Sequence, residues 1–484
     1  MDAKAIAGLG KQLDVFLKEF DDCFARSGSR ENLKVYVSGQ LSDLPRKSVE
    51  PMALRAKVPP RTLQMFLYSA KWEEDRMVDR LQWIVARDHA HPRAIGIIDE
   101  SGHPKKGTHT AAVQRQWCGN TGKKDNCVVG VHLAYAVADF HCLLDSDLYL
   151  PESWADDPLR RKETGVPEAG VYRKKTDIGL DQIRRAISNG IRFWALTFDE
   201  WYGRDGEFLD GLESLGQNYV GEVPSNFTGW TSEPEVLISP QPQDRHQRGS
   251  NGHFPRLSKK ALPASEVRNL VKYSRVFQNQ PWQPFHIKDG EKGPIVWEVK
   301  YVWFYRKNTK GLPGRVHWLI VARNGVDRDE IKYFVSNFPP DTPIETLLGV
   351  AFSRWPIEQC FEQAKNELGM DHFEVRSWPA IHRHYYATQI SHLFCSRVHR
   401  DWREKNDGEF LSDGGAGSFG RIRVHRGEAS FPVGAKNEIP GNGGNHRLLS
   451  TAQSAGPQIA YASDAPPFET FGYQPSATPV VCVG

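Results

Sequence analysis

Three acidic residues of this 484-residue chain have the type and placement of a shared metal site. Asp99 follows the apolar run AIGII and Asp199 follows the apolar run WALTF, so each is expected at the end of a β-strand. Glu358 falls in the first turn of a predicted helix, where Pro356 suits the first helical position because its missing N–H needs no partner there. A short aspartate on a rigid strand end fixes an ion, and a longer glutamate reaches it from the helix.

Three carboxylates brought together form a hard oxygen site, which suits Mg²⁺ or Mn²⁺. Two such ions held roughly 3.5–4 Å apart can activate a water or a 3′-hydroxyl and stabilise the leaving oxygen in phosphodiester cleavage. A single aspartate at a strand end is more often an ordinary turn residue than a metal ligand. The predicted site therefore depends on the fold bringing Asp99, Asp199 and Glu358 together as catalytic metal ligands.

Two cations accompany the glutamate along the same predicted helix. Arg354, Glu358 and Lys365 are separated by four and by seven residues, and at ~100° per residue they share one helical face. On that face the two cations could hold the scissile phosphate or a DNA end beside the glutamate. A plain i, i+4 ion pair on a solvated surface is the more frequent use of the spacing between Arg354 and Glu358, and both interpretations stay open.

Further DNA contacts are suggested by basic and aromatic residues. Lys105, Lys106 and Arg115 follow the first aspartate and could bind phosphates, although an exposed basic loop explains them equally well. Trp297 lies in a predicted strand and could stack on an unpaired base at a DNA end. Core packing is the commoner use of tryptophan in a strand. His103 could assist proton transfer, but a lone loop histidine usually has no special role.

The composition is that of a globular protein with substantial cores, at 39% hydrophobic and 25% charged residues. No apolar run of about 18 residues is present, so no membrane span is expected. The seven cysteines are scattered without a CxxC pair, which argues against a disulfide framework and against a structural zinc site and suits a reducing cytosol. The net charge of +3 gives no indication of nucleic acid, whereas the stretch 240–275 is locally basic and could neutralise phosphates or simply be a solvated loop.

Hydrophobic periodicity divides the chain into regions of different predicted secondary structure. Residues 1–90 are expected to be helical, and the Pro59–Pro60 break suggests a helix-turn-helix, with a helical bundle that binds nothing as an equal alternative. Three strands, a helix and a fourth strand follow, and then a basic, strand-rich region containing IVWEVKYVWFYRK and RVHWLIVARN. Helices return before the chain becomes dense in Gly, Ser and Pro near its end.

Ordered motifs now point to a family. The segment SRWPIEQCFEQAKNELGMDHFEVRSW resembles the C-terminal signature Y-x2-R-x3-E-x6-K of bacterial insertion-sequence transposases of the DDE type, and Arg354, Glu358 and Lys365 match its last three letters. IIDESGHPKKG resembles the first-aspartate motif of this family, and ALTFDEWYG resembles the second. The resemblance covers roughly residues 30–405. One departure is visible, because the tyrosine position of the signature falls on Ala351 and its phosphate contact is missing.

The resemblance implies an α/β fold: an RNase H-like mixed sheet interrupted by a β-strand insertion, preceded by an N-terminal all-helical domain. Together with the changes in sequence pattern, it divides the chain as follows: a helical DNA-binding domain (1–90), the first part of the catalytic core (91–223), the β-rich insertion (224–340), the C-terminal helices of the core (341–407) and, from its composition, a disordered or out-of-frame tail (408–484).

The resemblance also implies an activity. Such a transposase cleaves double-stranded DNA at the terminal inverted repeats of an insertion sequence and joins the freed 3′-OH ends to target DNA. Two Mg²⁺ ions, which Mn²⁺ can replace, would be held by Asp99, Asp199 and Glu358. Arg354 and Lys365 would contact the DNA backbone near the cut. A homodimer on DNA, a bacterial cytoplasmic protein associated with the nucleoid, and no membrane partner are the corresponding expectations.

Two other classes of protein remain as alternatives. A catalytically inactive DNA-binding remnant of a transposase would still recognise its ends, and the unusual tail indicates damage somewhere in the chain. A glycoside hydrolase could use paired carboxylates among the 14 tryptophans. That alternative predicts neither a metal requirement nor salt-sensitive DNA binding, and it leaves the basic helix face unexplained.

Overall fold

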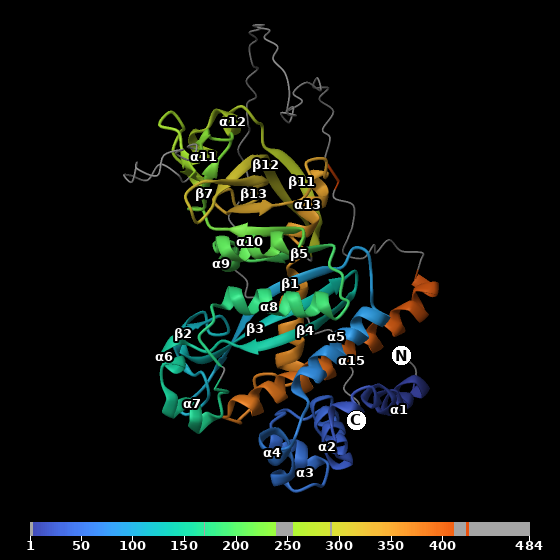
Figure 1. Cartoon of the computed structure of the whole chain (residues 1–484). Helices are drawn as coiled ribbons and strands as arrows, with labels where there is room; N and C mark the ends of the chain where they lie inside the picture. The colour runs from blue at the N-terminus through green and yellow to red at the C-terminus, as the bar shows by residue number, and fades with distance from the viewer. Residues whose placement is uncertain (1–2, 169, 239–254, 291–292, 411–422, 425–484) are drawn as a thin grey trace, which may run out of the picture. The chain divides into compact units, whose positions relative to one another are not determined.

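The central feature of the fold is one mixed sheet (Figure 1). The computed structural model describes residues 3–168, 170–238, 255–290, 293–410 and 423–424. Five strands form the middle of the sheet, in the spatial order β4-β3-β1-β5-β6. They are β1 (Ile95–Pro104), β3 (Lys123–Val137), β4 (Phe140–Leu148), β5 (Ala195–Phe198) and β6 (Tyr219–Val223).

The directions of these strands identify the fold class. β3 is antiparallel to both β1 and β4, whereas β5 lies between β1 and β6 and is parallel to each. Three antiparallel strands followed by two parallel ones, with a helix between the third and fourth, is the RNase H-like arrangement. The predicted fold class is therefore confirmed. All four residues of β5 are buried, as expected for a central parallel strand covered on both faces.

Helices pack against the strands of the sheet. α8 (Lys175–Ser188) contacts β3 and β4, and α5 (Glu74–Asp88) packs on β4. Gly190, in the left-handed region at φ 92°, follows the end of α8, a position where glycine is common. A strand that the sequence analysis missed, β2 (Gln114–Cys118), pairs with β3, and α6 (Glu152–Ala155) and α7 (Pro158–Thr164) follow β4.

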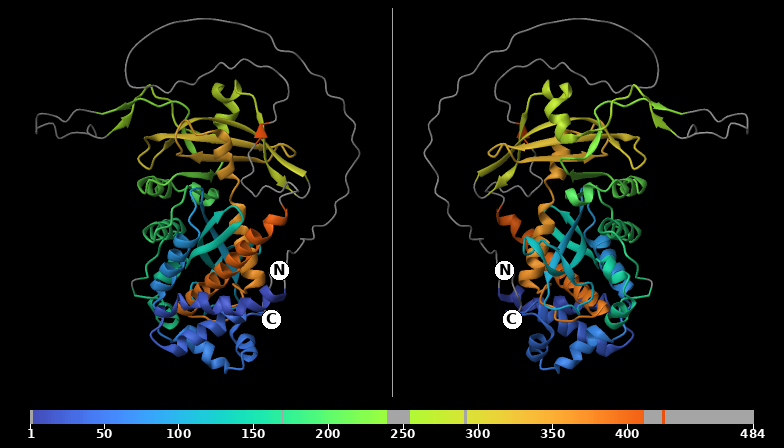
Figure 2. Two further views of the ribbon diagram at one scale, coloured as in Figure 1. Left: turned by 90° about the vertical axis from the view of Figure 1, so that its right-hand side faces the viewer. Right: turned by 90° about the vertical axis from the view of Figure 1, so that its left-hand side faces the viewer.

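The N-terminal region is all-helical, as predicted. It comprises α1 (Ala3–Lys18), a 3-10 turn (Asp21–Cys23), α2 (Ser27–Gln40), α3 (Val49–Arg55), α4 (Pro60–Tyr68) and α5. Figure 2 shows the orange C-terminal helix α15 (Trp378–Phe410) beside these blue helices. Phe16 packs on Phe394, and Tyr36 Oη lies 2.8 Å from His384 Nδ1. The apolar core is therefore continuous between the N-terminal helices and the helix that covers the sheet.

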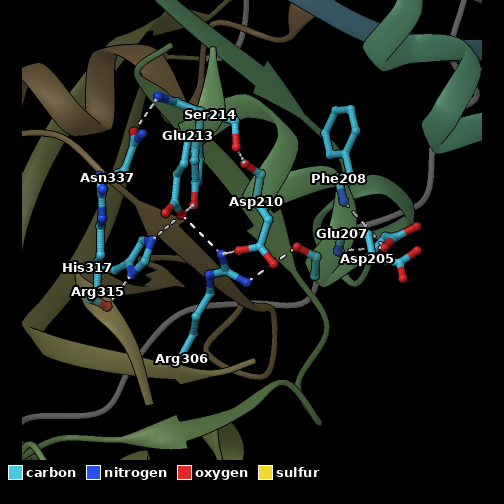
Figure 3. Close-up of polar contacts among 12 residues, drawn as sticks. Asp205, Glu207, Phe208, Asp210, Glu213, Ser214, Arg306, Arg315, His317 and Asn337 are labelled. Carbon is cyan, nitrogen blue, oxygen red and sulfur yellow. Dashed lines mark hydrogen bonds and ion pairs between the residues drawn. The ribbon is translucent and has the colours of Figure 1, made fainter. Parts of the chain in front are cut away.

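The expected β insertion extends the same sheet. Its elements are β7 (Thr228–Trp230), β8 (Val236–Leu237), β9 (Arg256–Leu257), β10 (Ser265–Glu266), α11 (Val267–Tyr273), α12 (Arg275–Gln278), β11 (Gln283–Gly290), β12 (Gly293–Lys307), β13 (Pro313–Asn324) and β14 (Ile331–Ser336). β14 pairs antiparallel with β6, so the inserted strands continue the core sheet from its edge. Figure 3 shows the polar cluster in which Arg306 of β12 and His317 of β13 reach Glu213 of α10 (Gly206–Ser214).

The chain returns to the core in α13 (Ile344–Ala351), α14 (Trp355–Glu362), a π-helical turn (Gln363–Glu367) and α15. The predicted boundary near residue 407 needs a small correction, because α15 continues to Phe410 and a two-residue strand, β15 (Arg423–Val424), pairs with β11. The rest of the predicted tail, 411–422 and 425–484, lies outside the described residues. In the part of the chain that is described, no helix is both long enough and apolar enough to cross a membrane.

Candidate active site

The first aspartate does not end its strand, in contrast to the prediction. β1 continues through Asp99 to Pro104, paired throughout with β3. The parallel pairing with β5 does end there: its last pair is Ile98 with Phe198. Asp99, within β1, and Asp199, the residue after β5, directly follow this last pair, so both lie where the pairing of β1 with β5 ends.

Asp199 is fixed by the helix that it begins. It is the N-cap of α9 (Glu200–Gly203), and its Oδ1 accepts hydrogen bonds from the backbone N–H groups of Trp201 (3.0 Å) and Tyr202 (3.3 Å). Such a cap satisfies helix donors that otherwise have no partner. No residue in the described ranges donates a hydrogen bond to Oδ2 of Asp199. One oxygen thus orients the carboxylate and the other is left for a ligand.

Asp99 lies in a mostly buried position. Its side chain is 13% exposed, Oδ1 accepts from the backbone N–H of Glu100 at 2.7 Å, and Oδ2 accepts from Arg354 Nη1 at 2.6 Å. Burial raises the pKa of Asp99 to about 7; the charge of Arg354 opposes the rise, and the nearby charge of Asp199 adds to it. A cation that comes close to Asp99 therefore stabilises the negatively charged form of its carboxyl group.

One guanidinium joins the helix carboxylate to the strand carboxylate. Arg354 directly precedes α14, and its Nη2 donates to Glu358 Oε1 at 2.7 Å while Nη1 bonds Asp99. The i, i+4 pair of Arg354 with Glu358 thus exists, but it is shared with Asp99, and the Arg354 side chain is 30% exposed. Glu358 sits in the first turn of α14, as predicted, and its side chain is 41% exposed.

The three carboxylates have the donor chemistry that suits a divalent cation, although their oxygens are not among the described groups whose ligand atoms all lie within 4.8 Å of one another. Carboxylates from β1, from the start of α9 and from α14 supply only hard oxygen donors, the chemistry preferred by Mg²⁺ and Mn²⁺. The guanidinium of Arg354 lies against two of the three carboxylates and shows that positive charge is accommodated there. Asp99, Asp199 and Glu358 are the residues that would hold such an ion.

Lys365 does not lie where a uniform α-helix from Arg354 onward would place it. The π-helical turn, in which the Leu368 N–H bonds the Gln363 carbonyl, lies between α14 and the following loop, so ~100° per residue does not hold through Lys365. Burial lowers the pKa of Lys365, and the charges of Asp371 and Asp99 act in the opposite direction. Lys365 is therefore close enough to Asp99 to be affected by it, from a half-buried position.

Two of the predicted DNA contacts point inward in the structure. Lys105 is drawn inward, where its Nζ donates to the Phe373 carbonyl at 2.8 Å and burial lowers its pKa to about 8. Trp297 is only 5% exposed and packs on Phe352 with ring centroids 5.0 Å apart, because its side of β12 faces the core. Core packing, the alternative use, therefore accounts for Trp297.

Lys106, Arg115 and two missed aromatic residues have the exposure that DNA contact needs. Lys106 lies in the loop after β1, and Arg115 lies on β2. Trp201, two residues after Asp199, is 46% exposed, and Trp355, next to Arg354, is 49% exposed. Both tryptophans lie close in sequence to residues of the family motifs, and this is the feature of the sequence that could have identified them. His103 is fully buried in β1, although it was expected in a loop.

A glycine sets the position of the helix that Asp199 caps. A Cβ placed on Gly203 of α9 would lie 1.9 Å from the carbonyl oxygen of Glu222 in β6, so only glycine allows this approach. We expect Gly203→Ala to destabilise the protein by about 1–3 kcal/mol, the usual cost of overpacking, and to displace Asp199 together with α9. Chemical denaturation and DNA cleavage assays would measure the two effects.

Gly206→Ala is the matched control for this substitution. Gly206 begins α10, and the nearest atom to an added Cβ, Arg306 Nη1, is 3.6 Å away, an ordinary contact distance. The control should be neutral or stabilising, because alanine favours helix more than glycine does. Equal stability of the two variants would contradict the role assigned to Gly203.

Comparison with known proteins identifies the family. A family model described as DDE superfamily endonuclease matches residues 19–294, more than half of the chain, and the chain belongs to this family. A probable transposase for the insertion sequence element IS701 from Microchaete diplosiphon is 26% identical over 379 residues, covering 77% of this chain and 83% of that protein. The matched range includes Asp99 and Asp199 and ends before Glu358.

Proposed function

We propose that this chain is an insertion-sequence transposase that cleaves DNA at the ends of its element and joins the freed 3′-OH ends to target DNA. The observation that carries the proposal is the arrangement of Asp99, Asp199 and Glu358, two of them bridged by Arg354. The likeness to the probable IS701 transposase over most of both chains supports the same activity.

The three carboxylates hold the catalytic ions in this proposal. Two divalent ions bound there, Mg²⁺ or Mn²⁺, supply the positive charge that activates the attacking group and stabilises the leaving oxygen of a phosphodiester. Asp199 enters the reaction already oriented by its two backbone hydrogen bonds. Burial of Asp99 strengthens its attraction for positive charge, because few waters screen it.

Arg354 exchanges partners when DNA and the ions bind. Without them its guanidinium neutralises Asp99 and Glu358. Ions held by the carboxylates would supply that positive charge instead, and the planar guanidinium of Arg354 would then be available to bind a phosphate in a bidentate manner. Lys365, Lys106 and Arg115 supply further positive charge to the DNA backbone, and the protein acts as a homodimer on the paired terminal inverted repeats.

The decisive test is cleavage of a labelled duplex that carries the ends of the element. We expect cuts at the end junction with Mg²⁺ or Mn²⁺ and none in EDTA, with binding weakened by added salt because phosphate contacts release counterions. Salt-sensitive binding without cleavage under any metal condition would instead indicate the inactive DNA-binding remnant. A folded protein that neither binds nor cleaves this DNA would contradict the proposal.

A further inference from the structure

A second group of metal-ligating side chains lies away from the three carboxylates and uses different chemistry. His141 on β4, Cys360 on α14 and His392 on α15 each present one ligand atom, and these atoms lie within 4.8 Å of one another. Cys360 and His392 are fully buried, and His141 is half-buried. Nitrogen and sulfur donors of this kind suit zinc-class transition metals, whereas carboxylates suit Mg²⁺.

The two imidazoles point to the same atom. Nε2 of His141 lies 3.1 Å and Nε2 of His392 lies 3.0 Å from Oε1 of Gln363, the first residue of the π-helical turn. Both rings have therefore converged on one position, next to the thiol of Cys360. A π-helical turn is a common feature of functional sites, and this one supplies the amide oxygen.

Hydrogen bonding alone leaves this cluster incompletely satisfied. The Gln363 amide oxygen has two lone pairs and can accept from both Nε2–H groups, but Nδ1 of His392 is buried with no hydrogen-bond partner among the described residues. A buried polar atom without a partner is costly and uncommon in native proteins. An ion coordinated by one nitrogen of each ring and by the Cys360 thiolate would account for the convergence of these three donors on one position.

We propose that His141, Cys360 and His392 bind one zinc-class ion, with the Gln363 amide oxygen or a water as the fourth ligand. Bonds of ~2.0–2.3 Å to such an ion require the ligand atoms to approach slightly from their present separations. The ion has a structural role: it fastens α14 to the sheet strand β4 and to the long helix α15. Glu358 precedes Cys360 by two residues on α14, so an ion bound by Cys360 also limits the movement of the helix that carries Glu358.

Sequence spacing gives no sign of this site. Its ligands come from three elements separated by 219 and 32 positions, which follows from residue numbers 141, 360 and 392, and no CxxC pair accompanies them. The scattered cysteines argue against a structural zinc site on spacing alone, because spacing does not show which residues the fold brings together. The inference stands on the cluster itself and does not depend on the proposed transposase activity.

The test is metal retention by the full-length protein. The chain is loaded with Co²⁺, desalted, and examined for cobalt content and for the absorption of a cobalt–thiolate bond. We expect about one Co²⁺ per chain, competed away by Zn²⁺ and not by Mg²⁺. Cys360→Ser should lose the thiolate absorption, whereas Cys23→Ser, an equally buried cysteine in the N-terminal helices, should keep it.

Two further variants make the outcome decisive. His141→Gln changes the least buried ligand and should lower retention even if Cys360→Ser fails to fold. Asp199→Asn should retain cobalt fully, because it alters only the carboxylate site. Wild-type protein that holds no more cobalt than Cys360→Ser or His141→Gln, or that shows no thiolate absorption, would overturn the proposal.

Discussion

Asp199→Asn removes end cleavage while leaving the protein as stable as the wild type. Asparagine keeps an oxygen that can accept the N–H groups of Trp201 and Tyr202, so α9 stays capped. The substitution removes only the negative charge and one oxygen donor of the proposed metal site. We expect single-turnover cleavage to fall on the order of 10³-fold or more, the scale on which loss of one member of a catalytic set acts.

The control for this substitution is another aspartate in the same structural role. Asp157 caps α7 by accepting from the N–H groups of Leu159 and Arg160, at 3.1 and 3.0 Å. Asp157→Asn should leave both cleavage and stability unchanged, because it preserves a cap and changes no proposed ligand. If Asp199→Asn cleaved DNA at the wild-type rate, Asp199 would not be a metal ligand, whatever its geometry.

The elements of the core could be predicted because local patterns determine them. Ile95–Ile98 and Ala195–Phe198 are short, mostly apolar runs typical of buried strands, and the alternating residues of β12 and β13 indicate strands. Their spatial order could not be derived in this way. Periodicity does not say which strand pairs with which, so only the resemblance to a family implied an RNase H-like sheet, and the order β4-β3-β1-β5-β6 comes from the structure.

The predictions at the site that differ from the structure do so because of tertiary contacts. Asp99 seemed to end a strand because the apolar run stops, but pairing with β3 continues the strand through polar residues. Lys105 seemed exposed because a loop was expected, yet carbonyl oxygens of the 371–373 segment attract it inward. Trp297 was assigned to DNA although one face of β12 packs on Phe352. In each case a distant segment decided the outcome.

Stability should depend strongly on a carboxylate that joins the insertion to the core. Oε1 of Glu213 in α10 accepts hydrogen bonds from His317 Nε2 at 2.8 Å and from Arg306 Nη2 at 3.2 Å (Figure 3). It also accepts one from Tyr219 Oη at 3.1 Å. Arg306 is itself only 3% exposed in its side chain and also pairs with Asp210. A buried charge cluster of this kind is sensitive to the loss of one member, because the remaining charges lose their partner.

Glu213→Gln is therefore expected to lower the free energy of unfolding by about 3 kcal/mol at neutral pH. Burial alone would raise the pKa of Glu213, but the hydrogen bond from His317 and the charges of His317 and Arg306 outweigh it and lower the pKa from 4.5 to about 2. A difference of that size between the folded and unfolded states corresponds to ~3 kcal/mol. Chemical denaturation followed by circular dichroism would measure it.

The pH dependence separates this charge effect from a simple packing defect. Because the folded pKa is depressed, the stabilisation from Glu213 is complete above pH 4.5 and is lost as the pH falls toward about 2. The stability difference between wild type and Glu213→Gln should accordingly shrink across that window, whereas a packing defect would persist at every pH. Glu207→Gln on the same helix, whose side chain is 63% exposed, should cost less than about 1 kcal/mol, so an equal loss there would contradict the assignment.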